Sequence, residues 1–263
     1  MFLMAGIASN VILYVGGERS QFVNPAFACT SATRVDFDAG LHLSQIPWFS
    51  AGVSFPVVKF NIFASAEGYF FNFPYYAEAG NKISEYTVGD VGLSFGIARE
   101  FGTVKAGVQV SSAYELLASS AGIALRIDAG ALISPQAFPL EVGLGFQGVG
   151  LTFLDSPTAC VFGKYRFPKG AGVYLLAGAE VSYTGAETSP LALNSISVSL
   201  SWLDKVGVGG SYGGLNTGIL FYIKPLNFLP EKDFSFLPSL NLLAGYSFIL
   251  GSTRMALSGS YIF

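Results

Sequence analysis

The residues of this sequence that could carry chemistry are few and widely spaced. The single histidine, His42, would need a neighbouring nucleophile and an orienting group for nucleophilic catalysis, and the sequence offers no such spacing. Cys29 and Cys160 form no metal-ligand spacing. An oxidising compartment would allow a disulfide between them, but we expect two unpaired small apolar residues. The sequence therefore predicts no enzyme, no metal and no cofactor, and we interpret His42 as a hydrogen-bond partner of Asp36 or Asp38.

One group of charged residues lies at strand-like spacing. Arg126 and Asp128 are two residues apart, so within a strand they share one face, and Glu141 falls on the next expected strand. We predict that these three residues form a polar network inside the protein. Two interpretations stay open. The network could be a polar gate, or it could pair buried ions, and the cost of an unpaired buried charge favours the pairing.

The composition indicates a membrane protein without membrane-spanning helices. Of the 263 residues, 51% are hydrophobic and only 12% are charged, against about 25% charged in an ordinary globular protein. The mean hydropathy is +0.52, yet the apolar runs are too short for a spanning helix of about 20 residues. Aromatic residues make up 15% of the chain. A transmembrane β-barrel satisfies all of these observations, and the net charge of −3 gives no sign of nucleic-acid binding.

Alternation of apolar and polar residues predicts the strands. About fourteen segments alternate, among them residues 33–44 and residues 195–202, where four serines oppose Ile196, Val198, Leu200 and Trp202. Short turns separate them, so we expect an up-and-down meander that closes on itself. A soluble β-sandwich would alternate in the same way, but 14 basic and 17 acidic residues are few for a water-facing exterior. Residues 69–87 are predicted to form the longest loop.

The two ends of the chain carry further expectations. Residues 1–17 contain no Lys or Arg, so either the true start lies upstream or the chain is already mature. Asn24 and Pro25 predict a turn. In residues 254–263, Met255, Leu257, Gly259, Tyr261 and Phe263 share one face. We expect this stripe to face lipid and this strand to close the sheet against the first one, with Tyr261 and Phe263 in an aromatic girdle.

Several short motifs resemble the fatty-acid-transporter (FadL) barrels and their PorV/PorQ branch. Asn24-Pro25-Ala26 resembles an element of the N-terminal plug of FadL barrels, and residues 96–102, 124–132 and 250–258 resemble the PorV/PorQ branch. The resemblance implies a fourteen-stranded outer-membrane barrel with an N-terminal segment that plugs the lumen. The expected fold is therefore an all-β, closed antiparallel transmembrane β-barrel (residues 33–263) preceded by a plug (residues 1–32).

The resemblance also implies a set of site residues and functions. Asn24, Pro25, Ala26 and Phe27 become the candidate plug gate, and the aromatic ending at Tyr261 and Phe263 resembles the signal read by the outer-membrane assembly machinery. Deleting Phe263 should therefore lower surface levels. The leading expectation is passive uptake of hydrophobic compounds, such as long-chain fatty acids, across the bacterial outer membrane.

Two other functions remain as alternatives. A PorV-like scaffold would receive cargo or dock a protein of a secretion complex rather than transport. A general porin is disfavoured, since a plug should obstruct flow and the lumen face carries few charges. Membrane lipids, a hydrophobic small molecule and the assembly machinery are the expected partners. A lipid-sized apolar cavity beside the plug would favour transport, whereas tight packing there would favour the scaffold.

Overall fold

The computed structural model describes residues 24–42, 46–76, 82–117, 120–135, 138–150, 157–167, 173–183, 191–202, 205–213, 217–228, 239–248 and 252–263. Among these residues no helix is long and apolar enough to cross a membrane. The described helical turns are η1 (Pro25–Ala28) and η3 (Pro225–Phe228). The strands are β1 (Arg34–His42), β2 (Ile46–Val57), β3 (Phe60–Tyr76), β4 (Lys82–Phe101), β5 (Val104–Leu117), β6 (Ser120–Ile133), β7 (Leu140–Gly150), β8 (Thr158–Arg166), β9 (Val173–Tyr183), β10 (Leu191–Trp202), β11 (Val206–Tyr212), β12 (Gly218–Ile223), β13 (Ser239–Ser247) and β14 (Ser252–Ile262).

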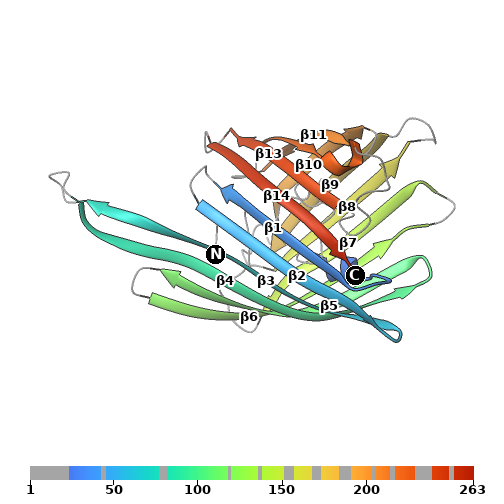
Figure 1. Ribbon diagram of the computed structural model, residues 1–263, viewed down its shortest axis with the longest axis horizontal. Helices are drawn as coiled ribbons and strands as arrows, with labels where there is room; N and C mark the ends of the chain where they lie inside the picture. The colour runs from blue at the N-terminus through green and yellow to red at the C-terminus, as the bar shows by residue number, and fades with distance from the viewer. Residues whose placement is uncertain are drawn as a thin grey trace.

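The described strands form one antiparallel meander around an interior (Figure 1). Each strand pairs with the one that follows it in the chain, and β14 pairs with β1 from Arg34 opposite Ile262 to Leu41 opposite Met255. The strand order therefore returns to its starting point, which leaves no free edge. The predicted count of about fourteen strands and their antiparallel order are confirmed.

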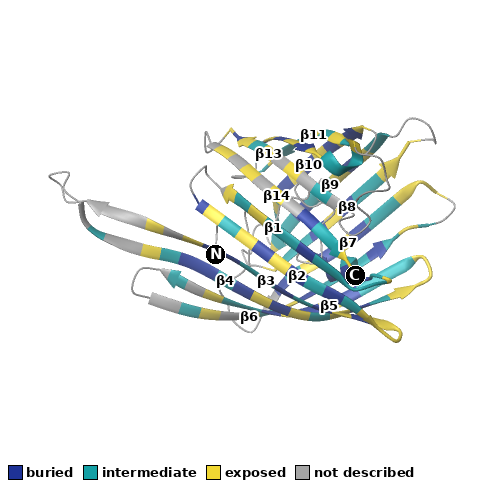
Figure 2. Ribbon diagram, viewed as in Figure 1, coloured by how far each residue is buried: buried dark blue, intermediate teal, exposed yellow. Residues whose placement is uncertain are grey.

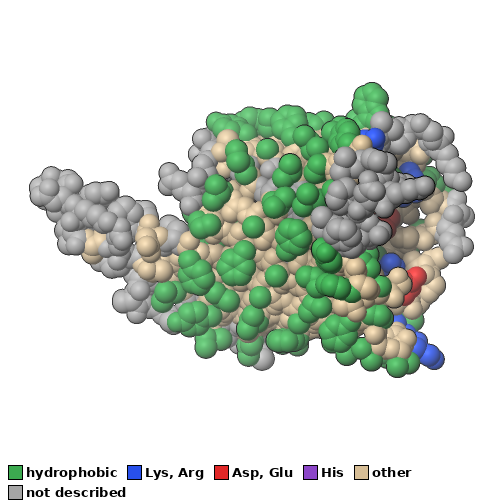
Figure 3. Space-filling model, in the orientation of Figure 1, with side chains coloured by type: hydrophobic (Ala, Val, Ile, Leu, Met, Phe, Trp, Pro, Cys, Tyr) green, Lys and Arg blue, Asp and Glu red, His purple; other side chains and the backbone are tan. Residues whose placement is uncertain are grey.

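Polar side chains face the interior of the barrel and apolar ones face outward. In β10 the four serines at 195, 197, 199 and 201 are buried, whereas Ile196, Val198, Leu200 and Trp202 are 45–64% exposed. In Figure 2 the same alternation of buried and exposed residues appears as bands of colour along the strands. On the face drawn in Figure 3, hydrophobic side chains spread over the strands and the charged ones gather toward one end. This inside-out distribution suits a wall surrounded by lipid, and the serine row lies on the interior rather than on an outer surface.

The predicted loop over residues 69–87 is wrong. β3 runs on to Tyr76 and β4 begins at Lys82, so most of this segment is a strand pair that extends beyond the rest of the sheet (Figure 1). The side-chain hydroxyl of Thr87 donates to Asn72 Oδ1 across this pair at 3.1 Å. Apolar and polar residues alternate where one face of a strand meets lipid. The alternation did not reveal this strand pair, because strands that project beyond the wall need no apolar face.

One end of the barrel, the terminal rim, carries the start of β1 and the end of β14. The backbone N–H of Phe263 donates to the carbonyl of Thr33 there at 2.9 Å. Two-residue turns at the same rim join β2 to β3 (Val58 and Lys59) and β4 to β5 (Gly102 and Thr103). Gly102 has a φ of 64°, which the tight hairpin needs and glycine adopts readily.

The outward stripe of β14 ends in two aromatic residues at the terminal rim. Met255 and Leu257 are 57% and 39% exposed, and Gly259, which lacks a side chain, is buried between its neighbours. The ring centres of Tyr261 and Phe263 are 5.2 Å apart, and Phe263 is 74% exposed. These positions fit the aromatic girdle that the sequence predicts.

Candidate functional site in the barrel interior

The candidate site begins with a short turn that precedes β1, the lumen turn (residues 24–29). Asn24 caps it, since its Oδ1 accepts from the Ala26 N–H at 3.0 Å, and Pro25 occupies the first helical position, where no N–H is needed. The Asn24 Nδ2 donates to the carbonyls of Ala131 (3.2 Å) and Leu144 (2.9 Å) on β6 and β7. Asn24 is fully buried. One side chain therefore both shapes the turn and ties it to the inner face of the wall.

Two glycines allow the lumen turn to approach the wall. Gly107 of β5 and Gly130 of β6 are directly paired. A Cβ on Gly107 would lie 2.6 Å from the Pro25 carbonyl carbon, and a Cβ on Gly130 would overlap the Asn24 side chain. Any larger residue would therefore have to displace the turn, because both strands are held by their ladders.

An apolar cluster holds the middle of the lumen turn. Ala26 packs against Leu132, Phe162 and Leu176, and Phe27 lies against the same group. The rings of Phe27 and Phe162 are nearly parallel, with their centres 5.7 Å apart and an interplanar angle of 12°. The three wall residues come from β6, β8 and β9, so the turn contacts strands well separated in sequence. An apolar patch thus lies in an interior that also carries many buried polar side chains.

A second apolar cluster holds the end of the lumen turn. It joins Ala28 and Cys29 to Phe63 of β3 and Ala98 of β4. Burial raises the pKa of the Cys29 thiol, so the reactive thiolate is disfavoured. Cys29 and Cys160 are both free thiols, which agrees with the predicted small apolar roles. Sequence reasoning named residues 24–27 but missed this second anchor, because nothing in the local pattern shows which strands it would meet.

The structure brings Arg126 and Asp128 together. The Arg126 Nε lies 3.3 Å from the Asp128 Oδ2, and Asp128 is fully buried. The carboxylate also accepts from Gln109 Nε2 (2.8 Å), Ser111 Oγ (3.1 Å) and the Gly148 N–H (2.9 Å). Gly148 has a φ of 79°, and the β6–β7 register shifts at this level. Asp128 therefore binds a strand backbone where the ladder is interrupted, which is a structural task.

Glu141 does not join this network, which corrects the predicted trio. Its Oε2 accepts from the Ser134 Oγ at 3.0 Å, near the terminal rim. Ser134 lies eight residues from Arg126, or about 26 Å at ~3.3 Å per residue. Glu67 of β3 takes the expected place, with its Oε1 4.0 Å from Arg126 Nη2. Sequence reasoning missed Glu67 because the contact joins strands that are not paired and reaches over β4 and β5.

The His42 side chain and residues 1–23 of the predicted plug lie outside the described residues. Among the side chains that the structure describes, no group of three or more His, Cys, Asp and Glu residues could hold a metal ion.

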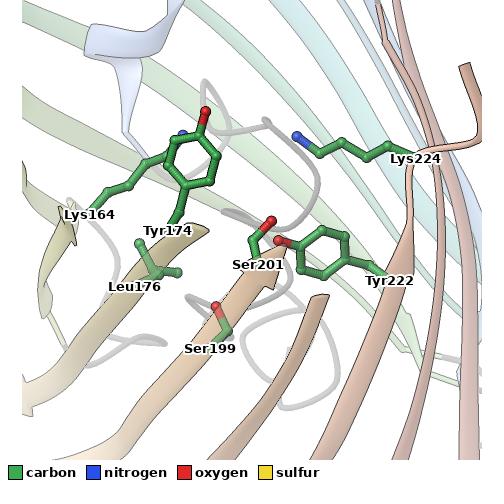
Figure 4. Close-up of a pocket in the computed structure, with 7 residues that line it drawn as sticks. All are labelled: Lys164, Tyr174, Leu176, Ser199, Ser201, Tyr222 and Lys224. Atoms are coloured by element: carbon green, nitrogen blue, oxygen red, sulfur yellow. The ribbon is translucent and has the colours of Figure 1, made fainter. Parts of the chain in front are cut away.

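A recess opens in the interior near the terminal rim, on the side of β8 to β12 (Figure 4). Its empty volume, including the space at its open mouth, is about 300 Å³, while its enclosed part has room for about one water molecule. This is not the lipid-sized apolar cavity that the transport hypothesis expects. The recess is lined by Lys164, Tyr174, Leu176, Ser199, Ser201, Tyr222 and Lys224.

The antiparallel wall, its apolar exterior and its polar interior define a β-barrel of the membrane-spanning class. Neither a protein-family model nor a curated protein matches the sequence. Among solved structures, the chain is similar to a Pseudomonas aeruginosa FadL homologue, with 11% identity over 91% of this chain and 93% of that one and a TM-score of 0.52. It is also similar to the TodX deltaS2S3 mutant monoaromatic hydrocarbon channel, with 9% identity, the same coverages and a TM-score of 0.58. The chain therefore has the fold of the FadL-type outer-membrane barrels.

Proposed function

We propose that this barrel is a bacterial outer-membrane channel for the passive uptake of hydrophobic compounds, such as long-chain fatty acids, with the lumen turn as its plug. The observation that carries the proposal is the apolar patch that Phe27, Phe162 and Leu176 form inside a wall whose interior carries many polar side chains. The fold likeness to a FadL homologue and to a hydrocarbon channel supports it.

Passage requires the lumen turn to move, since it occupies the interior against seven strands, β3 to β9. Its polar anchors are the two hydrogen bonds from Asn24 to the wall, each worth about 0.5–1.5 kcal/mol. Its apolar anchors are two small clusters, around Ala26 and around Cys29. A hydrophobic ligand that packs on Phe162 and Leu176 would replace the contacts of Phe27. The ligand's own contacts with the wall can thus replace, one by one, the contacts that hold the plug.

Uptake by whole cells tests the proposal. Cells that produce the barrel should take up a labelled long-chain fatty acid several-fold faster than cells that lack it, while uptake of a labelled sugar should not change. The difference follows from an apolar patch that offers a sugar no hydrogen bonds. Equal fatty-acid uptake by the two strains would contradict the proposal, and faster sugar uptake would revive the general porin.

One observation favours a second candidate, the PorV-like scaffold for a secretion complex. The lumen turn packs closely on the wall, and the enclosed part of the terminal recess holds about one water. A barrel that only docks proteins needs no larger space. Crosslinking in cells should then recover a large protein partner, and fatty-acid uptake should be the same with and without the barrel.

The roles of Tyr261 and Phe263 in assembly stay a prediction. Both lie at the terminal rim, and Phe263 is 74% exposed. The surface level of the Phe263 deletion tests this role, since normal insertion of the truncated chain would exclude it.

A further inference from the structure

We propose that the recess at the terminal rim, lined from β8, β9, β10 and the end of β12, is a binding site for an oxyanion such as a carboxylate, sulfonate or phosphate group. The site goes beyond the proposed transport, because binding there needs no passage and a scaffold would keep it. Two cationic side chains and several hydroxyl groups converge on the recess (Figure 4).

A buried hydroxyl without a partner points to a ligand. Ser201 is 5% exposed, lines the recess, and its Oγ has no hydrogen-bond partner. A buried polar group without a partner costs free energy, so a ligand that accepts from this hydroxyl would recover it. The Tyr222 hydroxyl lies at the same level of the wall, since a Cβ on Gly207, the residue paired with Ser201, would lie 2.6 Å from it. The two groups can donate to the same oxyanion.

Positive charge at the recess selects an anion. Lys224 is 4% exposed, and its backbone N–H donates to the Lys205 carbonyl at 2.7 Å, which fixes its position after β12. Across the recess, the Lys164 Nζ lies 5.0 Å from the centre of the Tyr174 ring. Both ammonium groups point into the interior, where a charge-assisted hydrogen bond is stronger than in water.

The acidic residue paired with Lys164 does not neutralise the charge of that lysine. Glu141 lies opposite Lys164 in the β7–β8 register, but its carboxylate accepts from Ser134. The described side chain of Lys164 makes no ion pair within 4.0 Å; its described contact is the tyrosine ring. Arg166 lies over the same ring at 5.2 Å, which adds another cation beside Lys164.

The recess also borders the apolar patch. Leu176 lines the recess and belongs to the cluster that holds Ala26 and Phe27. An anion with a small apolar body can therefore place its charged end near Lys164 and Lys224 and its body against Leu176. Benzenesulfonate has this form and dissolves in water, whereas benzyl alcohol has a similar body without the charge.

Calorimetric titration of the purified barrel, in an uncharged detergent, tests the site with benzenesulfonate, sulfate and benzyl alcohol. Benzenesulfonate should bind, and benzyl alcohol should bind at least ~10-fold more weakly. Ser201→Ala and Lys164→Gln should each raise the dissociation constant of benzenesulfonate about 10-fold. Sulfate that binds as tightly as benzenesulfonate would support a site for a free oxyanion; sulfate that binds more weakly would support one for the charged end of a larger molecule.

Two variants serve as matched controls. Ser197→Ala removes another buried hydroxyl without a partner from the same face of β10, away from the recess. Lys205→Gln removes a cation at the same rim that lies over the Phe228 ring instead. Both should leave the dissociation constant within about twofold of the parent, the change expected where no contact is lost. Failure of both anions to bind, equal binding of benzyl alcohol, or equal loss in Ser197→Ala and Ser201→Ala would overturn the proposal.

Discussion

Replacing Gly130 with valine should expel the lumen turn from its seat and expose Cys29. The added Cβ would overlap the Asn24 side chain, while β6 cannot retreat because it is paired with β5 and β7. An overpacking cost of about 1–3 kcal/mol raises the population of the displaced turn roughly 5- to 150-fold. In water the Cys29 thiol would regain its ordinary pKa, which burial raises in the folded protein. Maleimide labelling of Cys29, measured in a Cys160→Ala background, should therefore accelerate by that factor.

Gly122→Val is the control for this substitution. Gly122 lies on β6, on the same face as Gly130, and a Cβ there would meet nothing within 4 Å. It should leave the labelling rate of Cys29 unchanged. Cys29 could instead be labelled as slowly in Gly130→Val as in Gly122→Val. The lumen turn would then not need a glycine at position 130 to keep its place.

Replacing Asp128 with alanine should cost the barrel about 3–5 kcal/mol of unfolding free energy, the range for breaking a buried ion pair. The substitution leaves the Gly148 N–H and the Gln109 amide without their acceptor. It also leaves Arg126 with Glu67 at 4.0 Å as its remaining described ion pair. Reversible urea unfolding in lipid vesicles measures the change.

Glu141→Gln provides the comparison for Asp128. Glu141 is a carboxylate at the rim with one hydrogen bond from Ser134, so its replacement should change the unfolding free energy by no more than about 0.5 kcal/mol. Equal losses in the two variants would show that the Asp128 hydrogen bonds do not hold the β6–β7 bulge.

The alternation of apolar and polar residues was sufficient to predict the wall. It placed the four serines of β10 on one face and Ile196 to Trp202 on the other, as the structure has them. The reason is that a strand in lipid must be apolar on its outer face along its whole length. The same rule misplaced residues 69–87, where the strands pair beyond the barrel.

Contacts in the interior between segments that are not paired could not be predicted from the sequence. Asn24 reaches carbonyl groups 107 and 120 residues away, and Arg126 meets Glu67 from an unpaired strand. Such contacts depend on barrel curvature and strand stagger, which a period-2 pattern does not contain. Sequence reasoning therefore found residues 24–27 and the pair Arg126 and Asp128, but placed Glu141 in the network where Glu67 belongs. It also overlooked the recess, whose lining comes from four strands.

The central claim is that the lumen turn moves when a hydrophobic compound passes, and a disulfide that fixes the turn tests it. Ala98 of β4 belongs to the same apolar cluster as Cys29, so Ala98→Cys in a Cys160→Ala background offers the native Cys29 a partner across the contact. Loss of free thiols reports how completely the bond forms, and the same chain with Cys29→Ser is the control.

The measurement is uptake of a labelled long-chain fatty acid by cells with the oxidised and the reduced protein. We expect uptake in the oxidised state to fall to the level of cells without the barrel, and to return when the disulfide is reduced. The Cys29→Ser control should show the same uptake in both states. Undiminished uptake through a fully oxidised barrel would contradict the account, because the lumen turn would then be a fixed part of the wall.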